Sequence, residues 1–181
     1  MAYDYWVIYD TVTGGVITTG SGVEGAAQAQ PLNEGWAVMV IPSQAMRPLG
    51  QVDLPTIKAS YAASIDQDAN KVCSMFITNT PSQMATYLVK EAEARGVLAG
   101  DDAPTVFLST EAEAIGVSVP DLALEVVAQA DIWRPIGARI EAARRKAKLT
   151  LLAAENLVEI AAAIAINWRE VVEPPEPEPE A

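Results

Sequence analysis

Acid–base and nucleophilic chemistry depends on a small set of side chains, and this sequence is poor in them. The chain contains 24 Asp and Glu residues but no histidine and only one cysteine. Histidine is the usual general acid or base near neutral pH, so its absence excludes Ser–His–Asp triads, Cys–His pairs and histidine-based zinc sites. Cys73 has no second cysteine with which to form a disulfide or a cysteine-rich zinc site. We therefore predict no catalytic residue, no cofactor and no metal site, and a structural or interaction protein rather than an enzyme.

Pairs of carboxylates are the remaining catalytic candidates, because glycosidases need only two Asp or Glu side chains. The candidate pairs are Glu91 with Glu93, Asp101 with Asp102, and Glu111 with Glu113. Residues two apart on a helix point in different directions, and a solvated surface explains these acids equally well. A glycan-cleaving enzyme stays as the weakest alternative, to be tested by replacing Glu91 or Asp101.

Glycine spacing in the segment 20–25 matches a dinucleotide-binding fingerprint only as a string of letters. A real site of that kind needs a strand, the glycine turn and a long crossover helix. Here the chain reaches Pro31 within six residues and then enters a strand-like segment. We interpret residues 20–25 as a glycine loop without a cofactor.

Charge limits the partners of this chain, whose formal net charge is −12. A protein with this much negative charge is repelled by phosphate backbones, which disfavours nucleic-acid binding. The one basic cluster, Arg144-Arg145-Lys146 with Lys148, lies in a helical pattern and is expected to be a solvated face. No run of about 18 apolar residues and no secretory signal occurs, so we expect no membrane insertion and synthesis in a cytoplasm.

Residues 1–50 have the composition of a small β domain. The run Tyr5–Tyr9 is rich in β-branched and aromatic residues, and Thr11–Gly15 supplies a turn before a return strand at Val16–Thr19. A third strand is predicted for Trp36–Ile41. Three short strands are marginal alone, so one face must be covered.

Residues 51–169 are predicted to form an all-α bundle of about four to five helices. Asp53 is expected to cap the first helix, and Thr80-Pro81 to start the second. A short helix is predicted over Val106–Ile115 and stops at Gly116. Ser118 opens a long helix, with a kink or break expected at Pro135. An Asn156/Glu159 capping box starts a last helix that reaches about Trp168. The fold class is therefore α+β.

Residues 170–181 form the third region, a Pro- and Glu-rich tail that is expected to be extended and disordered. Candidate core or interface anchors in the other two regions are mainly aromatic, because such side chains bury large apolar areas. They are Tyr5, Trp6, Trp36, Tyr61, Phe76, Tyr87, Trp133, Ile140 and Trp168.

Two sets of segments carry a resemblance to a known group of proteins. The first set is Tyr5–Tyr9, Thr13–Val16, Thr19–Gly22, Ala29–Pro31 and Gly35–Val38, and the second is Ile65-Asp66, Tyr87–Ala94, Glu111-Ala112, Ala130–Trp133 and Ile140–Arg145. In their order and spacing, the first set is similar to the N-terminal part of small tail-associated proteins of tailed bacteriophages and prophages. The second set resembles a helical domain appended to such proteins.

This resemblance implies a structural protein of a phage tail, such as a fibre, a baseplate appendage or an adaptor. Its partners would be other tail proteins and further copies of itself around a threefold or sixfold axis, and residues 1–50 would dock it on the tail. The chain would be made in the host cytoplasm and reside in the virion. A tail-fibre assembly chaperone is the alternative, and a cytoplasmic helical adaptor is also compatible with the composition. The resemblance carries no catalytic residues.

Overall fold

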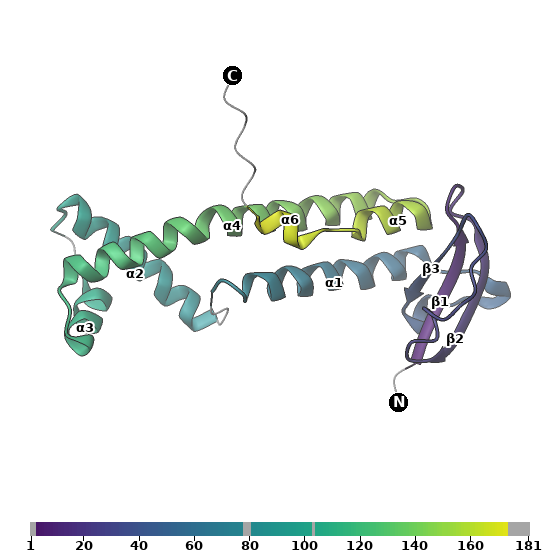
Figure 1. The fold of residues 1–181 in the computed structure, drawn as a ribbon, viewed down its shortest axis with the longest axis horizontal. Helices are drawn as coiled ribbons and strands as arrows, with labels where there is room; N and C mark the ends of the chain where they lie inside the picture. Colours follow the sequence, from purple (N-terminus) through teal and green to yellow (C-terminus); the bar gives the residue numbers. More distant parts are fainter. Residues whose placement is uncertain (1–2, 78–80, 103, 174–181) are drawn as a thin grey trace, which may run out of the picture. The chain divides into compact units, whose positions relative to one another are not determined.

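The computed structural model describes residues 3–77, 81–102 and 104–173, and it confirms the α+β class (Figure 1). A small antiparallel sheet comes first and helices follow. The strands are β1 (Tyr3–Asp10), β2 (Val16–Val23) and β3 (Trp36–Ile41), the short 3₁₀ turns are η1 (Ser43–Ala45) and η2 (Pro48–Gly50), and the helices are α1 (Leu54–Cys73), α2 (Pro81–Ala99), α3 (Val106–Ile115), α4 (Val119–Ala153), α5 (Leu157–Ile164) and α6 (Trp168–Val172).

The chain divides into two compact units. Unit 1 comprises Met1–Ala69 with Ala142–Asn167, and unit 2 comprises Asn70–Glu141 with Trp168–Ala181. Unit 1 thus groups the sheet with helical segments, whereas the composition of the sequence places a boundary near residue 50. Residues 170–172, assigned to the tail from the sequence, are helical in α6, and residues 174–181 lie outside the described part.

The sheet has the order β2-β1-β3, with β1 antiparallel to both neighbours (Figure 1). The central strand is apolar on both faces, which explains its position. Trp6 and Ile8 pack with Ala27 on one face, while Val7 and Tyr9 are buried on the other. Both faces of the sheet are therefore covered within unit 1.

The predicted glycine loop is wrong in its first part, because Gly20–Val23 continues strand β2. Gly20 pairs with Trp6, whose indole lies close against it: a Cβ on Gly20 would stand 2.5 Å from Cζ2 of that ring. The glycines leave space for the tryptophan, and this cross-strand contact stabilises a strand of low β-propensity.

Side-chain caps mark the starts of two helices of unit 1, α1 and α5. The carboxylate of Asp53 accepts hydrogen bonds from the backbone N–H (3.2 Å) and the hydroxyl of Thr56, as expected for the start of α1. The capping box of α5 is also confirmed, since the Glu159 N–H donates to Asn156 Oδ1 (3.0 Å). Helix α5 ends at Ile164, however, short of the predicted Trp168. No glycine or proline marks that end, so the sequence pattern overruns it.

Within unit 1, a lysine of α1 contacts the C-terminal end of α4. At the end of α4, the Lys58 ammonium donates to the carbonyls of Leu152 (2.8 Å) and Ala154 (2.9 Å). A cation at this position complements the negative end of the helix dipole. No local sequence pattern predicts this contact, because 94 residues separate Lys58 from Leu152.

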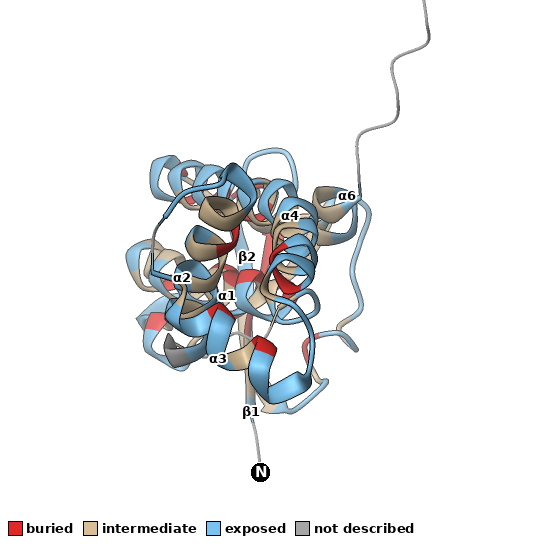
Figure 2. Cartoon of the chain, turned by 90° about the vertical axis from the view of Figure 1, so that its left-hand side faces the viewer, coloured by how far each residue is buried: buried red, intermediate tan, exposed pale blue. Residues whose placement is uncertain are grey.

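Unit 2 has a small core, in which α2, α3 and the first part of α4 meet. Its buried members are Ala94, Leu108, Ala112, Leu122 and Ala123. Three of the five are alanine, which permits close helix approach. Few positions of the helices are buried, and the others are half-buried or exposed (Figure 2).

Of the kink or break predicted at Pro135, the break is wrong, since α4 runs without interruption from Val119 to Ala153. Proline removes one backbone donor and crowds the carbonyl four residues earlier. Pro135 lies on the exposed side of the helix, where water can bond to that carbonyl. The predicted short helix α3 and its end at Gly116, which adopts a left-handed φ of 74°, are confirmed.

Candidate interaction surfaces

The carboxylates proposed as pairs serve as structural partners in unit 2. Glu91 accepts from Arg95 (2.8 Å) and forms an ion pair with Arg134 (2.5 Å). Glu93 instead accepts from the backbone N–H groups of Phe107 (3.3 Å) and Leu108 (2.9 Å), at the first turn of α3. The two side chains thus engage different elements, as their spacing on the helix suggested.

The third pair separates in the same way. Glu111 forms an ion pair with Lys90 (2.5 Å), whereas Glu113 is exposed on α3. Asp101 binds through its backbone N–H to the Gly96 carbonyl (2.9 Å) at the end of α2.

Cys73 ends helix α1 and is half-buried. Burial, together with the negative charge of Glu141, raises the pKa of its thiol. A thiol with a raised pKa is a poor nucleophile near neutral pH. These properties fit the packing role predicted from the sequence.

The basic cluster of α4 is only partly the solvated face that was predicted. Arg144 and Lys148 both bond to Asp66 of α1, each at 2.6 Å. Hydrogen bonds from Lys148 and then Arg144 are the main causes that lower the pKa of Asp66. Arg145 and Lys146 are exposed, as expected.

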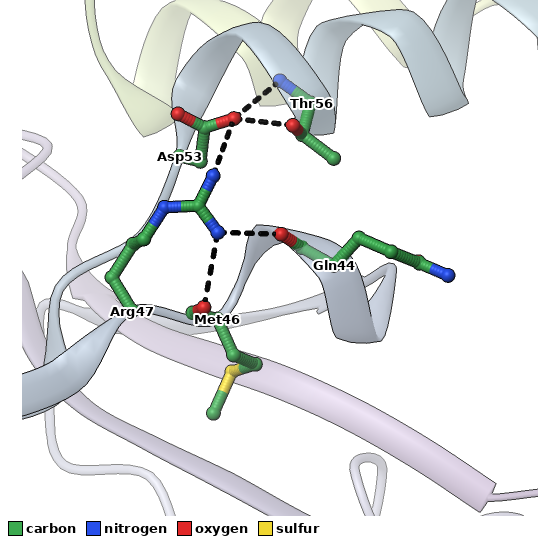
Figure 3. A network of polar contacts seen from close by, with 5 residues as sticks. All are labelled: Gln44, Met46, Arg47, Asp53 and Thr56. Atoms are coloured by element: carbon green, nitrogen blue, oxygen red, sulfur yellow. Dashed lines mark hydrogen bonds and ion pairs between the residues drawn. The ribbon is translucent and has the colours of Figure 1, made fainter.

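A second polar network fixes the segment that leads from the sheet into α1 (Figure 3). The Arg47 guanidinium donates to the carbonyls of Gln44 (2.7 Å) and Met46 (3.2 Å) and forms an ion pair with Asp53 (3.1 Å). Asp53 also caps α1 through Thr56. The hydrogen bonds and the nearby guanidinium lower the pKa of Asp53, so this carboxylate is charged at neutral pH. The network holds the η2 turn next to the start of the helix.

The first apolar surface is a groove of about 320 Å³ in unit 2, here called the α2/α4 groove. Phe76 and Trp133 both line it, and their ring centroids are 6.3 Å apart. The residues that line it are Phe76, Ile77, Met84, Tyr87, Leu88, Lys90, Glu91, Val126, Gln129, Ala130 and Trp133. Phe76, Tyr87 and Leu88 are 42%, 41% and 66% exposed. Large apolar side chains thus remain open to solvent in the single chain.

The sequence-predicted anchors fall into three groups. Trp6 and Ile140 are buried in the chain, and Phe76 and Tyr87 are exposed in the α2/α4 groove. The partly buried anchors are Tyr5, Trp36, Tyr61, Trp133 and Trp168. The α2/α4 groove therefore brings together Phe76, Tyr87 and Trp133, while the other anchors lie elsewhere.

The second surface lies entirely in unit 1 and is here called the β2 groove, with a volume of about 630 Å³. It runs between β2, the η2 turn and the start of α5. Its lining residues are Gly14, Val16–Thr19, Leu49–Val52, Leu54 and Glu155–Leu157. Sequence reasoning missed this surface, because its walls come from three distant segments.

Leu49 is the most unusual residue of the β2 groove. Its backbone adopts φ 61° and ψ 28°, which among the described residues makes it the sole non-glycine with a positive φ. Its side chain is 97% exposed. A branched apolar residue in this conformation is a backbone outlier of the kind that marks functional loops. The Pro48-Leu49-Gly50 sequence signals a turn but not this conformation.

Residues 3–77, 81–102 and 104–173 contain neither a candidate membrane span nor a candidate metal site. Within these ranges no helix has the length and apolar character that crossing a bilayer requires, and no group of three or more Cys, Asp or Glu side chains is arranged to hold a metal ion.

Comparisons of the chain with protein-family models, with curated proteins and with solved structures found no match.

Proposed function

We propose that this chain is a structural protein of a bacteriophage tail, such as a fibre, baseplate appendage or adaptor, that acts through contacts with other proteins. The observation that carries the proposal is the α2/α4 groove, where Phe76, Tyr87 and Leu88 are exposed around Trp133. Exposed apolar surfaces framed by polar residues are typical of protein–protein contact sites. The assignment to a phage tail depends on the resemblance of the sequence segments described above.

The ionisable groups give this proposal independent support. Three of the six acids that were candidates for catalysis make structural contacts: Glu91 pairs with Arg95 and Arg134, Glu111 pairs with Lys90, and Glu93 caps the start of α3. Such contacts position helices, and they leave aromatic surface as the available means of recognition. Aromatic side chains are enriched in the energetically important parts of interfaces.

A further copy of the chain is the proposed occupant of the α2/α4 groove. The anchors Phe76 and Tyr87, which the sequence pattern assigns to a core, are open in the single chain and would become buried in an oligomer. Threefold and sixfold arrangements both fit the architecture of a tail. The other proposed partners are neighbouring tail proteins. We propose neither nucleic-acid binding nor membrane insertion for this chain.

Mass spectrometry of purified intact particles tests this function directly. A structural tail protein is expected in the particle at a fixed ratio to other tail proteins. Absence of the chain from intact particles would contradict the structural role. Its presence only in assembly intermediates that contain fibres would indicate a tail-fibre assembly chaperone.

Variants with Tyr87→Ser and Leu88→Ser link the test to the groove. Incorporation into particles should fall strongly, because two exposed apolar side chains are lost from the contact. The matched control is Leu124→Ser, which removes a leucine of similar exposure that does not line the groove. Equal incorporation of the groove variant and the control would contradict the proposed contact.

A further inference from the structure

We infer that the β2 groove binds an extended segment of another protein, which adds as a strand along β2 and places a Lys or Arg side chain against Glu155. This inference rests on the proposed function in one respect, namely that the chain works by binding proteins. It adds a second surface in unit 1 and states the chemistry of its partner.

The backbone of β2 supplies the first argument. Strand β2 is at one edge of the sheet, and no other described strand pairs with its outer side. An uncovered edge presents backbone donors and acceptors that an incoming strand can satisfy. At the other edge, the Tyr61 hydroxyl donates to the Val40 carbonyl of β3 (2.6 Å). Strand addition is therefore favoured at β2.

The side chains around the groove supply the second argument. Val16 and Ile17 of β2 are each more than one third exposed, and Leu49 stands almost fully in solvent beside them. Alternate side chains of an added strand would point into a groove of about 630 Å³ and cover these apolar groups. Covering Leu49 would also offset the conformational cost of its left-handed backbone.

Charge identifies the occupant. Glu155 is the single charged residue among those that line the β2 groove, and in the described part of the chain its carboxylate has no ion-pair partner. A basic residue in the added strand complements this charge. The chain's own C-terminal segment is excluded as occupant, because residues 173–180 are all Glu or Pro. Glutamate would be repelled, and proline lacks the ladder donor.

A defined peptide tests the inference with the full chain. The probe is an acetylated, amidated heptapeptide of sequence TVTKTIT, which places Val, Lys and Ile on one face of an extended strand. In ¹⁵N-correlated NMR titrations, shifts are expected for the backbone amides of β2 and for Leu49–Val52. The peptide TVTETIT should bind at least about fivefold more weakly, because its Glu faces Glu155.

Two controls separate strand addition from unspecific apolar contact. The same peptide N-methylated on alternate amides keeps its side chains but loses the ladder donors, so its binding should disappear. On the protein side, Leu49→Gly keeps the left-handed backbone accessible and removes the side chain, so affinity for TVTKTIT should fall about tenfold. Leu152→Ala, an exposed leucine that does not line the groove, is the matched control and should bind normally.

Charge reversal gives the sharpest outcome. In Glu155→Lys, the order of the two peptides should invert, with TVTETIT binding more tightly than TVTKTIT. No binding of TVTKTIT at about 1 mM, equal binding of its N-methylated form, or an unchanged peptide order in Glu155→Lys would each overturn the inference. Incorporation into phage particles is a separate measurement. Failure of the peptide experiment therefore does not contradict the proposed function, and absence of the chain from particles does not contradict peptide binding at the β2 groove.

Discussion

Trp6 and Gly20 show how one glycine accommodates an aromatic ring in this sheet. A Cβ at position 20 would lie 2.5 Å from Cζ2 and 2.6 Å from Cε2 of the indole, and neither atom can move without displacing the buried ring. We predict that Gly20→Ala lowers the free energy of unfolding by about 2 kcal/mol, measured by urea titration. The comparison variant is Gly96→Ala in α2, where the added Cβ meets nothing closer than 3.7 Å. Its higher helix propensity should stabilise the protein by up to about 1 kcal/mol. Equal effects of the two alanines would contradict this account.

Asp66 provides a pH-dependent contribution through its contacts with Arg144 and Lys148. These contacts lower the pKa of Asp66 in the folded state, so its stabilising contribution is full above the unfolded-state pKa of about 4 and is lost as pH falls through the folded pKa. The Asp66 side chain is 40% exposed, so screening limits the contribution to about 0.5–1 kcal/mol. The expected result is that Asp66→Asn is less stable than the wild type at pH 7 and that this difference shrinks as pH falls below about 4. A difference that does not shrink at acidic pH would show that lost packing, and not charge, is responsible.

Among the elements, α3 illustrates a cap supplied from outside the helix. Thr105 precedes α3 but makes no side-chain cap, and Glu93 of α2 accepts from the N–H groups of Phe107 and Leu108 instead. A carboxylate at a helix N-terminus also complements the helix dipole. Glu93→Ala should therefore lower the free energy of unfolding by about 1 kcal/mol, measured by denaturant titration. Glu113→Ala, at an exposed position within α3, should change it by less than about 0.5 kcal/mol.

Local signals explain which elements could be predicted from the sequence. Strand β3 begins and ends where its apolar run does, and the caps Asp53 and Asn156 mark the starts of α1 and α5. These features depend on residues close together in the chain. The strand character of Gly20–Val23 depends on the ring of Trp6, which is contributed by the neighbouring strand.

The candidate surfaces were predicted even less completely than the elements. Phe76, Tyr87 and Trp133 stood out as aromatic residues, but their shared groove requires the packing of α2 against α4. The β2 groove combines β2 with Leu49 and Glu155, and no local pattern relates these segments. The break at Pro135 was wrongly predicted for a related reason, since the effect of a proline depends on which side of α4 faces solvent.

At the scale of the whole molecule, net charge controls how copies of the chain associate. With a formal net charge of −12, copies repel one another at low ionic strength, while the apolar contacts of the α2/α4 groove are insensitive to moderate salt. Self-association should therefore strengthen several-fold when NaCl is raised from about 0.05 to 0.5 M, measured by sedimentation velocity. The Tyr87→Ser, Leu88→Ser variant should remain monomeric at both salt concentrations, and Leu124→Ser should behave as the wild type. Association that weakens with salt would mean that ion pairs drive it.

The contact between Tyr61 and Val40 has a consequence for how far assembly through the sheet can proceed. Burial raises the pKa of Tyr61 to about 12, so its hydroxyl remains a donor to the β3 carbonyl at all ordinary pH values. A sheet with two uncovered edges can add strands on both sides and polymerise without limit, as amyloid does. Here growth at β3 would first have to displace Tyr61, so only β2 is readily extended. If a segment adds along β2 as inferred above, each chain would accept one strand at that edge, and Tyr61 would keep the β3 edge from propagating the addition into a fibril.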